Sequence, residues 1–180
     1  SRYAINGWGV LFLQEIKGYT LAAATQVISV NALCGIVGTV FSGWLSDAFF
    51  HGRRNVLAFG FGVLNTVALC LFLYSGDGLV VNILSMILFG VAIGVLICFL
   101  GGLMAIDIVP REATGAALGI VGMASYVGAG LQDIVSGWLI NSGKTELEGV
   151  TSYNFDSAII FWIAASAVSF ILALFVAKKK

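Results

Sequence analysis

Five stretches of this chain are long, apolar and almost free of charged side chains, and this pattern limits the possible fold more than any other feature. They are Leu21–Leu45, Val56–Tyr74, Leu79–Ile106, Ala113–Ile140 and Ser157–Ala177. A helix that crosses a membrane needs roughly 20 mostly apolar residues, and each stretch meets that length. Open strands are excluded because their backbone groups would find no partners in lipid, so the runs favour helices.

A sixth apolar stretch, Tyr3–Leu13, is too short to cross a bilayer alone. The chain begins at Ser1 rather than at a methionine, so we expect a truncated helix whose start lies upstream. The sequence therefore predicts an all-α membrane protein, a bundle of six transmembrane helices. The bundle forms one domain over residues 1–180, a fragment of a longer polypeptide.

The composition agrees with a lipid environment and excludes several classes of function. Only 10% of the residues are charged and the net charge is zero, whereas a soluble domain has about 25% charged residues. Without a basic surface, nucleic acid is not an expected partner. Cys34, Cys70 and Cys98 lie in apolar runs and His51 has no Cys or His nearby, so we expect neither a metal site nor disulfides.

Basic residues gather on one side of the predicted membrane. If the chain crosses six times, that side holds Arg53, Arg54, Arg111 and Lys178–Lys180. The opposite loops hold only Lys17 and Lys144. Since loops rich in Lys and Arg remain in the cytoplasm, we predict that the basic side and the C-terminus are cytoplasmic.

One short repeat is visible in the sequence. The residues Ser-Gly-Trp-Leu occur at Ser42–Leu45 and again at Ser136–Leu139. The first copy ends the second predicted helix and the other ends the fifth, on opposite sides of the membrane. These are equivalent positions in two three-helix units of opposite topology, an inverted repeat typical of transporters. A match of this length also arises by chance.

Glycines recur at helical spacing within the predicted spans. They include Gly35 and Gly38, Gly90 and Gly94, and Gly115, Gly119 and Gly122. Small residues let two membrane helices approach closely. The pattern therefore predicts tight helix packing, sliding surfaces for a moving transporter, or both.

Arg2 is a charged side chain where lipid should exclude one. It lies about 15 residues before Lys17, which places it roughly 22 Å below the outer end of its helix. A guanidinium is a planar fork that binds a phosphate or carboxylate through two parallel bonds. One interpretation is an anion-binding arginine in a central cavity. The other is an arginine at a helix end that extends to the lipid headgroups.

The fifth predicted helix carries a phenol and a carboxylate on one face. Tyr126 and Asp133 are seven residues apart, so their side chains project to the same side. The pair suggests the wall of a cavity, although Asp133 is also compatible with the external interface. Asn31 and Asn65 are weaker candidates, because an asparagine within a span more often forms an interhelical hydrogen bond.

The loop after the second predicted helix suggests a gate. Asp47 follows the C-terminal end of that helix, where the macrodipole disfavours a negative charge. Arg53, Arg54 or the N-terminus of the fifth helix near Ala113 would compensate for it. Asp47, Arg53, Arg54 and Arg111 are the candidate gating residues. A solvated loop with ordinary charges is the alternative.

Three motifs in the chain resemble a known family. They are Arg2-Tyr3-x-Ile5-x-x-Trp8, then Gly43-Trp44-x-Ser46-Asp47 followed by Gly52-x-Arg54, and then Pro110-Arg111-x-Ala113-x-Gly115 continuing to Tyr126-x-Gly128. The second motif is similar to the inter-helix signature of the major facilitator superfamily. Together the three resemble the second half of the organophosphate:phosphate antiporters. That group includes glycerol-3-phosphate transporters, hexose-phosphate transporters and a related hexose-phosphate sensor.

The resemblance implies one half of a twelve-helix fold built from two inverted repeats of three helices, with the N-terminal half missing. It implies exchange of a sugar phosphate or glycerol phosphate for inorganic phosphate across a bacterial inner membrane, without a cofactor or an enzymatic step. The arginine matching Arg2 would bind the phosphate group and the tyrosine matching Tyr126 would line the cavity. The substrate-binding candidates are Arg2, Tyr3, Trp8, Asn31, Tyr126 and Asp133.

Some positions depart from the family pattern. Gly7 and Val10 replace an acidic residue and a proline beside Trp8, and Leu96-Ile97 stands where the fourth helix often has Gly-Pro. Asp133 matches no family feature. These departures leave two alternatives to transport of a phosphorylated solute: a membrane sensor of a sugar phosphate with the same fold, or a facilitator for another organic anion.

Overall fold

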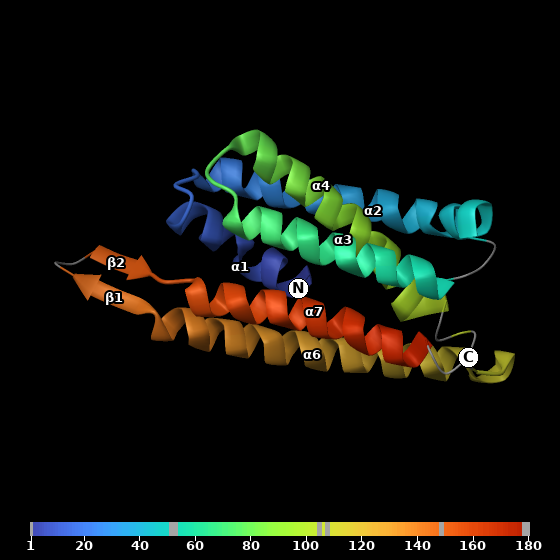
Figure 1. Ribbon diagram of the computed structural model, residues 1–180. Helices are drawn as coiled ribbons and strands as arrows, with labels where there is room; N and C mark the ends of the chain where they lie inside the picture. The colour runs from blue at the N-terminus through green and yellow to red at the C-terminus, as the bar shows by residue number, and fades with distance from the viewer. Residues whose placement is uncertain (1, 51–53, 104–105, 107–108, 148–149, 178–180) are drawn as a thin grey trace.

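The protein is a bundle of long helices that run side by side in alternating directions (Figure 1). The computed structural model describes residues 2–50, 54–103, 106, 109–147 and 150–177. Its long helices are α1 (Arg2–Glu15), α2 (Leu21–Phe50), α3 (Arg54–Tyr74), α4 (Leu79–Leu96), α6 (Thr114–Ser142) and α7 (Asp156–Ala177). The prediction of an all-α membrane protein with six helices is therefore confirmed.

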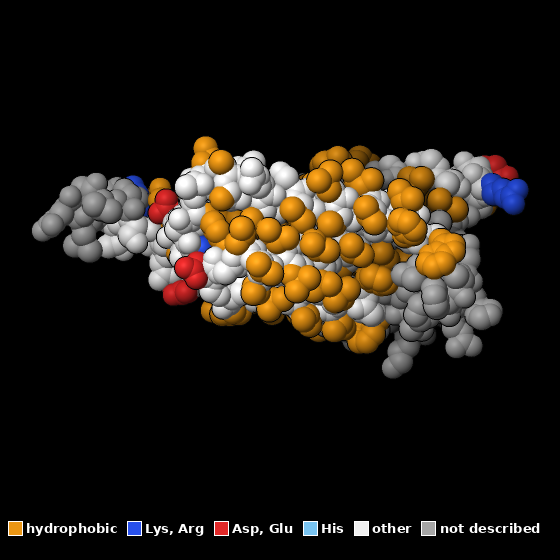
Figure 2. Space-filling view, turned by 90° about the horizontal axis from the view of Figure 1, so that it is seen from above, with side chains coloured by type: hydrophobic (Ala, Val, Ile, Leu, Met, Phe, Trp, Pro, Cys, Tyr) orange, Lys and Arg blue, Asp and Glu red, His pale blue; other side chains and the backbone are white. Residues whose placement is uncertain are grey.

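Several helices have the length and composition needed to cross a bilayer. Among the described side chains, Leu21–Trp44, Leu79–Gly102 and Arg111–Ser142 meet both conditions, and Ala58–Tyr74 and Asp156–Ser169 form shorter apolar helices. Figure 2 shows hydrophobic side chains over the middle of one face and charged side chains towards its two ends. This distribution is the one expected of a surface that faces hydrocarbon in the middle and water at both ends.

Aromatic side chains form the buried core where α1 meets α3 and α7. The ring of Phe12 lies 5.7 Å from that of Phe72 and 5.6 Å from that of Phe155, measured between centroids. Trp162 is fully buried, and its Nε1 donates a hydrogen bond of 2.8 Å to Ser136 Oγ. This bond connects α7 to α6, and it satisfies the indole N–H in an apolar setting.

Glycines bring α2 and α4 into direct backbone contact, as the small-residue pattern predicts. A Cβ atom built on Gly38 would overlap the backbone of Val91, and one on Gly94 would overlap the carbonyl oxygen of Gly35. Thr39 Oγ1 donates to the Gly94 carbonyl oxygen at 3.2 Å across the same contact. We call this contact, formed by Gly35, Gly38, Gly90 and Gly94, the α2–α4 seam.

The structure differs from the sequence prediction in four places. Helix α2 continues to Phe50 rather than ending at Leu45, so Asp47 lies in its last turn. The predicted fourth span is divided, because α4 ends at Leu96 and the chain continues as a π-helix, η1 (Ile97–Leu103). A short 3-10 helix, η2 (Arg111–Ala113), precedes α6.

The fourth difference is a β-hairpin in the stretch expected to be a loop. Strand β1 (Lys144–Leu147) pairs antiparallel with β2 (Val150–Tyr153), and Leu147 lies opposite Val150 in the register. The hairpin projects from the end of α6 (Figure 1). Val, Thr and Tyr favour strands, and a Glu-Gly pair stands between the two segments, so the sequence did carry a signal for it.

Candidate functional site

Helix α1 lies between α2 and α6 and leaves one side uncovered. Its exposed or half-buried residues on that side are Arg2, Tyr3, Asn6, Gly7, Val10 and Gln14. These positions follow the three- and four-residue spacing of one helical face. We call this surface the open face of α1, and it carries two of the residues that the sequence singled out.

On the α6 flank, two close approaches fix α1 in place. A Cβ atom on Gly7 would lie 3.7 Å from Asp133 Oδ1, and a Cβ atom on Gly137 would lie 3.3 Å from Trp8 Cζ2. The structure therefore brings Trp8 and Asp133 to the boundary between these two helices. Asp133 itself remains exposed.

Arg2 and Tyr126 lie at similar depths in the bundle. Helices α1 and α6 run in the same direction (Figure 1). Arg2 precedes Gly7 by five residues, and Tyr126 precedes Asp133 by seven, so at 1.5 Å per residue their levels differ by only about 3 Å. Tyr126 is 73% exposed, and the Arg2 guanidinium is exposed and lies 5.8 Å from the Tyr3 ring centroid.

On the α2 flank, Asn31 is buried and forms an interhelical hydrogen bond. Its Nδ2 donates to Asn6 Oδ1 at 3.1 Å. Asn6 was not predicted from the sequence as a site residue, although it follows Arg2 by four residues and so shares its face. The amide pair places polar groups beside Arg2, and it gives Asn31 the packing role that was the alternative to ligand binding.

The candidate gate lies largely outside the residues whose side chains are described. Arg53 is outside the described residues, and for Asp47 and Arg54 the structure describes only the helical backbone. Arg111 is exposed at the start of η2. The attraction between Asp47 and the arginines at this gate therefore stays a prediction.

A polar network that the sequence analysis missed joins the helix ends at the opposite side of the bundle. Lys17 Nζ donates to Asn82 Oδ1 at 2.6 Å, to Ser75 Oγ at 3.1 Å and to the Phe72 carbonyl oxygen. It also lies 4.8 Å from the Phe72 ring centroid. Tyr19 extends the network, because its hydroxyl donates to the Asp77 carbonyl oxygen at 2.6 Å. We call these contacts the Lys17 network.

Burial makes the Lys17 ammonium group more acidic. Removal of the ammonium from water lowers the pKa of Lys17 from 10.5 to about 8, and the Asp77 carboxylate opposes part of that shift. The network ties the turn after α1 to the end of α3 and the start of α4. It therefore holds together the ends of α1, α3 and α4 on this side of the bundle.

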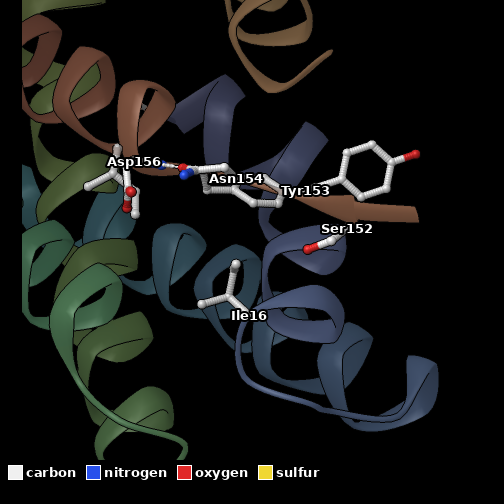
Figure 3. Close-up of a pocket in the computed structure, with 7 residues that line it drawn as sticks. Ile16, Ser152, Tyr153, Asn154 and Asp156 are labelled. Carbon is white, nitrogen blue, oxygen red and sulfur yellow. Dashed lines mark hydrogen bonds between the residues drawn. The ribbon is translucent and has the colours of Figure 1, made fainter. Parts of the chain in front are cut away.

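A shallow cavity of about 310 Å³ lies at the same end of the bundle (Figure 3). Its lining residues are Ile16, Ser152, Tyr153, Asn154, Phe155, Asp156 and Ile159. Asn154 Oδ1 accepts a hydrogen bond from the backbone N–H of Asp156 at 2.7 Å, which caps the first turn of α7. The one charged lining residue is an aspartate, so this cavity is a poor site for an anion.

The described side chains offer little for a metal or cofactor. Among them, no group of three or more His, Cys, Asp or Glu lies close enough together to hold a metal ion. Cys34, Cys70 and Cys98 are half-buried free thiols on three different segments. The chemistry that the described residues do offer is the binding of charged and hydroxylated groups on the open face of α1.

Comparison with known proteins finds relatives for most of the chain. Residues 1–132 match the family profile of the Major Facilitator Superfamily. The glycerol-3-phosphate transporter of Bacillus subtilis (strain 168) is 35% identical over 132 residues, which cover 71% of this chain and 29% of the relative. The membrane sensor protein UhpC of Salmonella typhimurium is 35% identical over 142 residues, covering 76% of this chain and 30% of the relative.

A more distant match has a related name. The probable hexose phosphate transport protein of Chlamydia trachomatis is 30% identical over 135 residues, covering 71% of this chain and 28% of the relative. No solved structure matches the chain significantly. The matched region thus spans less than a third of the length of each of these relatives.

Proposed function

The chain belongs to the major facilitator superfamily, and on that premise we propose that it forms one six-helix half of a secondary transporter. The whole protein would exchange a sugar phosphate or glycerol phosphate for inorganic phosphate by alternating access. Similar proteins carry the names glycerol-3-phosphate transporter and probable hexose phosphate transport protein. Such a protein would be a multi-pass protein of the bacterial inner membrane, with its basic side and C-terminus in the cytoplasm.

The observation that carries the proposal is the position of Arg2. Its guanidinium is exposed on the open face of α1, beside Asn6 and at about the depth of Tyr126. A planar fork of N–H donors matches the oxygens of a phosphate group better than a point charge does. Arg2 would therefore bind the phosphate, and the amide and phenol would bind nearby hydroxyl or phosphate oxygens.

A second six-helix bundle would close the site. Large apolar side chains remain exposed along α2 and α6, including Trp44 at 60% and Trp138 at 68%. In transporters of this architecture the substrate site lies near the middle of the membrane between two such bundles. We propose that a preceding segment of the same polypeptide supplies the second bundle and covers the open face of α1.

Exchange follows from the charge of the site. In a space of low polarity, an arginine without an anion retains an unfavourable desolvation cost. A bound phosphate offsets that cost, so the loaded site would change conformation more readily than the empty one. Binding and movement require no covalent step and no cofactor. Asp47, Arg53, Arg54 and Arg111 would stabilise the closed cytoplasmic gate.

The proposal is tested with the complete protein in proteoliposomes loaded with inorganic phosphate. Labelled glucose 6-phosphate or glycerol 3-phosphate should enter in a saturable exchange for the internal phosphate. Arg2→Lys should weaken substrate affinity by at least about tenfold, because an ammonium cannot reproduce the two parallel bonds.

The matched control is Lys144→Arg, which exchanges the same two residue types in β1 at the far end of α6. It should leave the affinity unchanged. Equal affinities in wild type and Arg2→Lys would remove Arg2 from the site. Competition by inorganic phosphate, compared with competition by carboxylates, would separate this function from that of a facilitator for another organic anion.

A sensor is the second candidate function. The observation that favours it is the 35% identity to a protein named as a membrane sensor, over 76% of this chain. A sensor would bind the sugar phosphate on the same face and report it to another protein. Saturable binding by the purified protein without flux into proteoliposomes would favour the sensor over the transporter.

A further inference from the structure

Two charged side chains stand apart from all the others in the described helices. Asp133 lies within α6, and Arg2, the first residue of α1, lies at about the depth of Tyr126, whereas the other described charged side chains, such as Glu15, Lys17 and Asp156, lie towards the two ends of the bundle. Charged groups at this depth are costly and face a polar space or a partner. The pair therefore requires an explanation that packing alone does not give.

The two charges lie on adjacent helices with a defined offset. Asp133 Oδ1 is next to Gly7, and Gly7 follows Arg2 by five residues, which is about 7.5 Å along the axis of α1. In the described part of the chain, no salt bridge engages either side chain. One positive and one negative group thus remain available at the boundary of α1 and α6.

Large apolar side chains are exposed on either side of Asp133 along α6, and the half-buried Gln132 is its polar neighbour in the sequence. Its neighbours in sequence include Ile134, which is 70% exposed, and Leu131, which is also exposed. Asp133 precedes the end of α6 at Ser142 by nine residues, so it lies about 13.5 Å inside that end. When lipid or a second bundle covers this region, the carboxylate needs a cation or hydrogen-bond donors.

A phosphate bound at Arg2 makes it more important that a cation or hydrogen-bond donors lie beside the Asp133 carboxylate. A phosphate monoester carries nearly two negative charges at neutral pH, so one arginine neutralises only part of it. Asp133 adds a further negative charge a short distance away. A solute with an ammonium group at the end opposite its phosphate would neutralise Asp133, and its phosphate would neutralise Arg2.

We infer that this site selects zwitterionic phosphorylated amines, such as amino sugar phosphates, with the phosphate bound at Arg2 and the ammonium at Asp133. The inference rests on the proposed function, and it names the substrate class of the same site. Gly7 contributes by having no side chain, because a larger residue there would cover the carboxylate from the α1 side. Arg2 and Asp133 thus fix the orientation of the solute along the open face of α1.

The experiment compares two solutes that differ at one position of the sugar. Unlabelled glucosamine 6-phosphate and glucose 6-phosphate compete against labelled inorganic phosphate for exchange by the complete protein in proteoliposomes at pH 7. The amine should compete at least about tenfold better, the advantage expected of one charge-assisted hydrogen bond. In Asp133→Asn the ratio of the two inhibition constants should fall to about one.

Glu15→Gln is the matched control, since it also removes one exposed carboxylate, at the end of α1 beyond the open face. It should keep the wild-type ratio. Gly7→Val provides a second variant in case Asp133→Asn fails to fold, and it should also reduce the preference for the amine. A wild-type ratio near one, or a ratio that neither variant changes, would overturn the inference while leaving phosphate exchange intact. Absence of exchange with every solute would instead overturn the proposed function.

Discussion

The α2–α4 seam and helix α6 use the same small residue at similar spacing, but the structure gives it opposite surroundings. In the seam, a Cβ atom on Gly90 would overlap the carbonyl oxygen of Asn31. On α6, Cβ atoms on Gly119 and Gly122 would meet no atom within 4 Å. The seam is packed by this chain alone, whereas in the described structure the α6 glycines from Gly115 to Gly130 are uncovered and only Gly137, nearer the end of the helix, meets a neighbour, Trp8 of α1.

This contrast shows that glycine spacing predicts the ability of a helix to be approached closely, but not the identity of the approaching helix. The seam is an internal contact that stabilises the bundle. The exposed glycines and apolar side chains of α6 are suited to a contact with a second bundle, or to a surface that slides during transport. If the two regions differ in this way, equivalent substitutions should change the stability of the protein by different amounts in each.

The largest effect is expected from a methyl group in the seam. Gly94→Ala places a Cβ atom against the backbone of Gly35, and backbone cannot move aside as a flexible side chain can. Overpacking of this kind should cost about 3 kcal/mol of stability, measured as a lower midpoint of thermal unfolding in detergent. Gly119→Ala is the matched control on α6, and it should change the midpoint little or raise it slightly. Equal losses of stability in Gly94→Ala and Gly119→Ala would show that the seam and α6 do not differ in packing.

The next effect concerns the Lys17 network, which fixes the ends of α1, α3 and α4 on one side of the bundle. Lys17→Met keeps the apolar length of the side chain but removes its bonds to Asn82, Ser75 and the Phe72 carbonyl oxygen. The expected loss is about 2 kcal/mol, because partly buried acceptors lose a charged donor. Lys144→Met, in the exposed hairpin, serves as the control in the same thermal unfolding measurement. No difference between the two variants would show that the network does not contribute to stability.

A smaller effect is expected where α6 is held to its neighbour α7. Ser136→Ala removes the acceptor for the buried Trp162 Nε1. An unpaired indole N–H should reduce stability by about 1 kcal/mol, detected as a shift in Trp fluorescence and a lower unfolding midpoint. Ser142→Ala changes the same residue type at the exposed end of α6, where the hydroxyl donates only to its own helix. A loss as large in Ser142→Ala would argue against a special role for Ser136.

The smallest effect is a dependence of stability on pH. The folded protein releases the Lys17 proton at a pH near 8, whereas the ordinary pKa is 10.5. Between these values the unfolded chain binds more protons, so stability should rise slightly with pH over that range. The neutral amine still donates two hydrogen bonds, and it accepts one from Ser75, so the network persists. The slope should be absent in Lys17→Met, and an unchanged slope there would assign it to another group.

The helices and the family were predictable because lipid leaves few choices for a long apolar run. The lengths of the runs fixed the number of helices, and the motifs around Arg2, Asp47 and Arg111 identified the family that the comparisons confirm. The exact ends of the helices were not predictable from the runs: α2 continues to Phe50, because Ser46 to Phe50 can extend a helix even though the apolar run has ended.

The contacts of single side chains were not predictable in the same way. The acceptors of Lys17 come from residues more than 50 positions away, and no local pattern specifies them. Asn6 became visible as a site residue only through its bond to Asn31 across two helices. The hairpin was missed because a short polar stretch between two spans is ordinarily a loop, although its strand-forming residues and Glu-Gly pair were present.

The exposure of position 126 to water decides whether Tyr126 faces a solute pathway or lipid. Tyr126→Cys is made in the complete protein with Cys34, Cys70 and Cys98 replaced by alanine, and Ile160→Cys on α7 is the control. If Tyr126 lines the solute pathway, a water-soluble maleimide labels position 126, glucose 6-phosphate protects it, and position 160 reacts only with a lipid-soluble reagent. Labelling of position 126 by the lipid-soluble reagent alone, without protection by the sugar phosphate, would contradict a place for Tyr126 in that pathway.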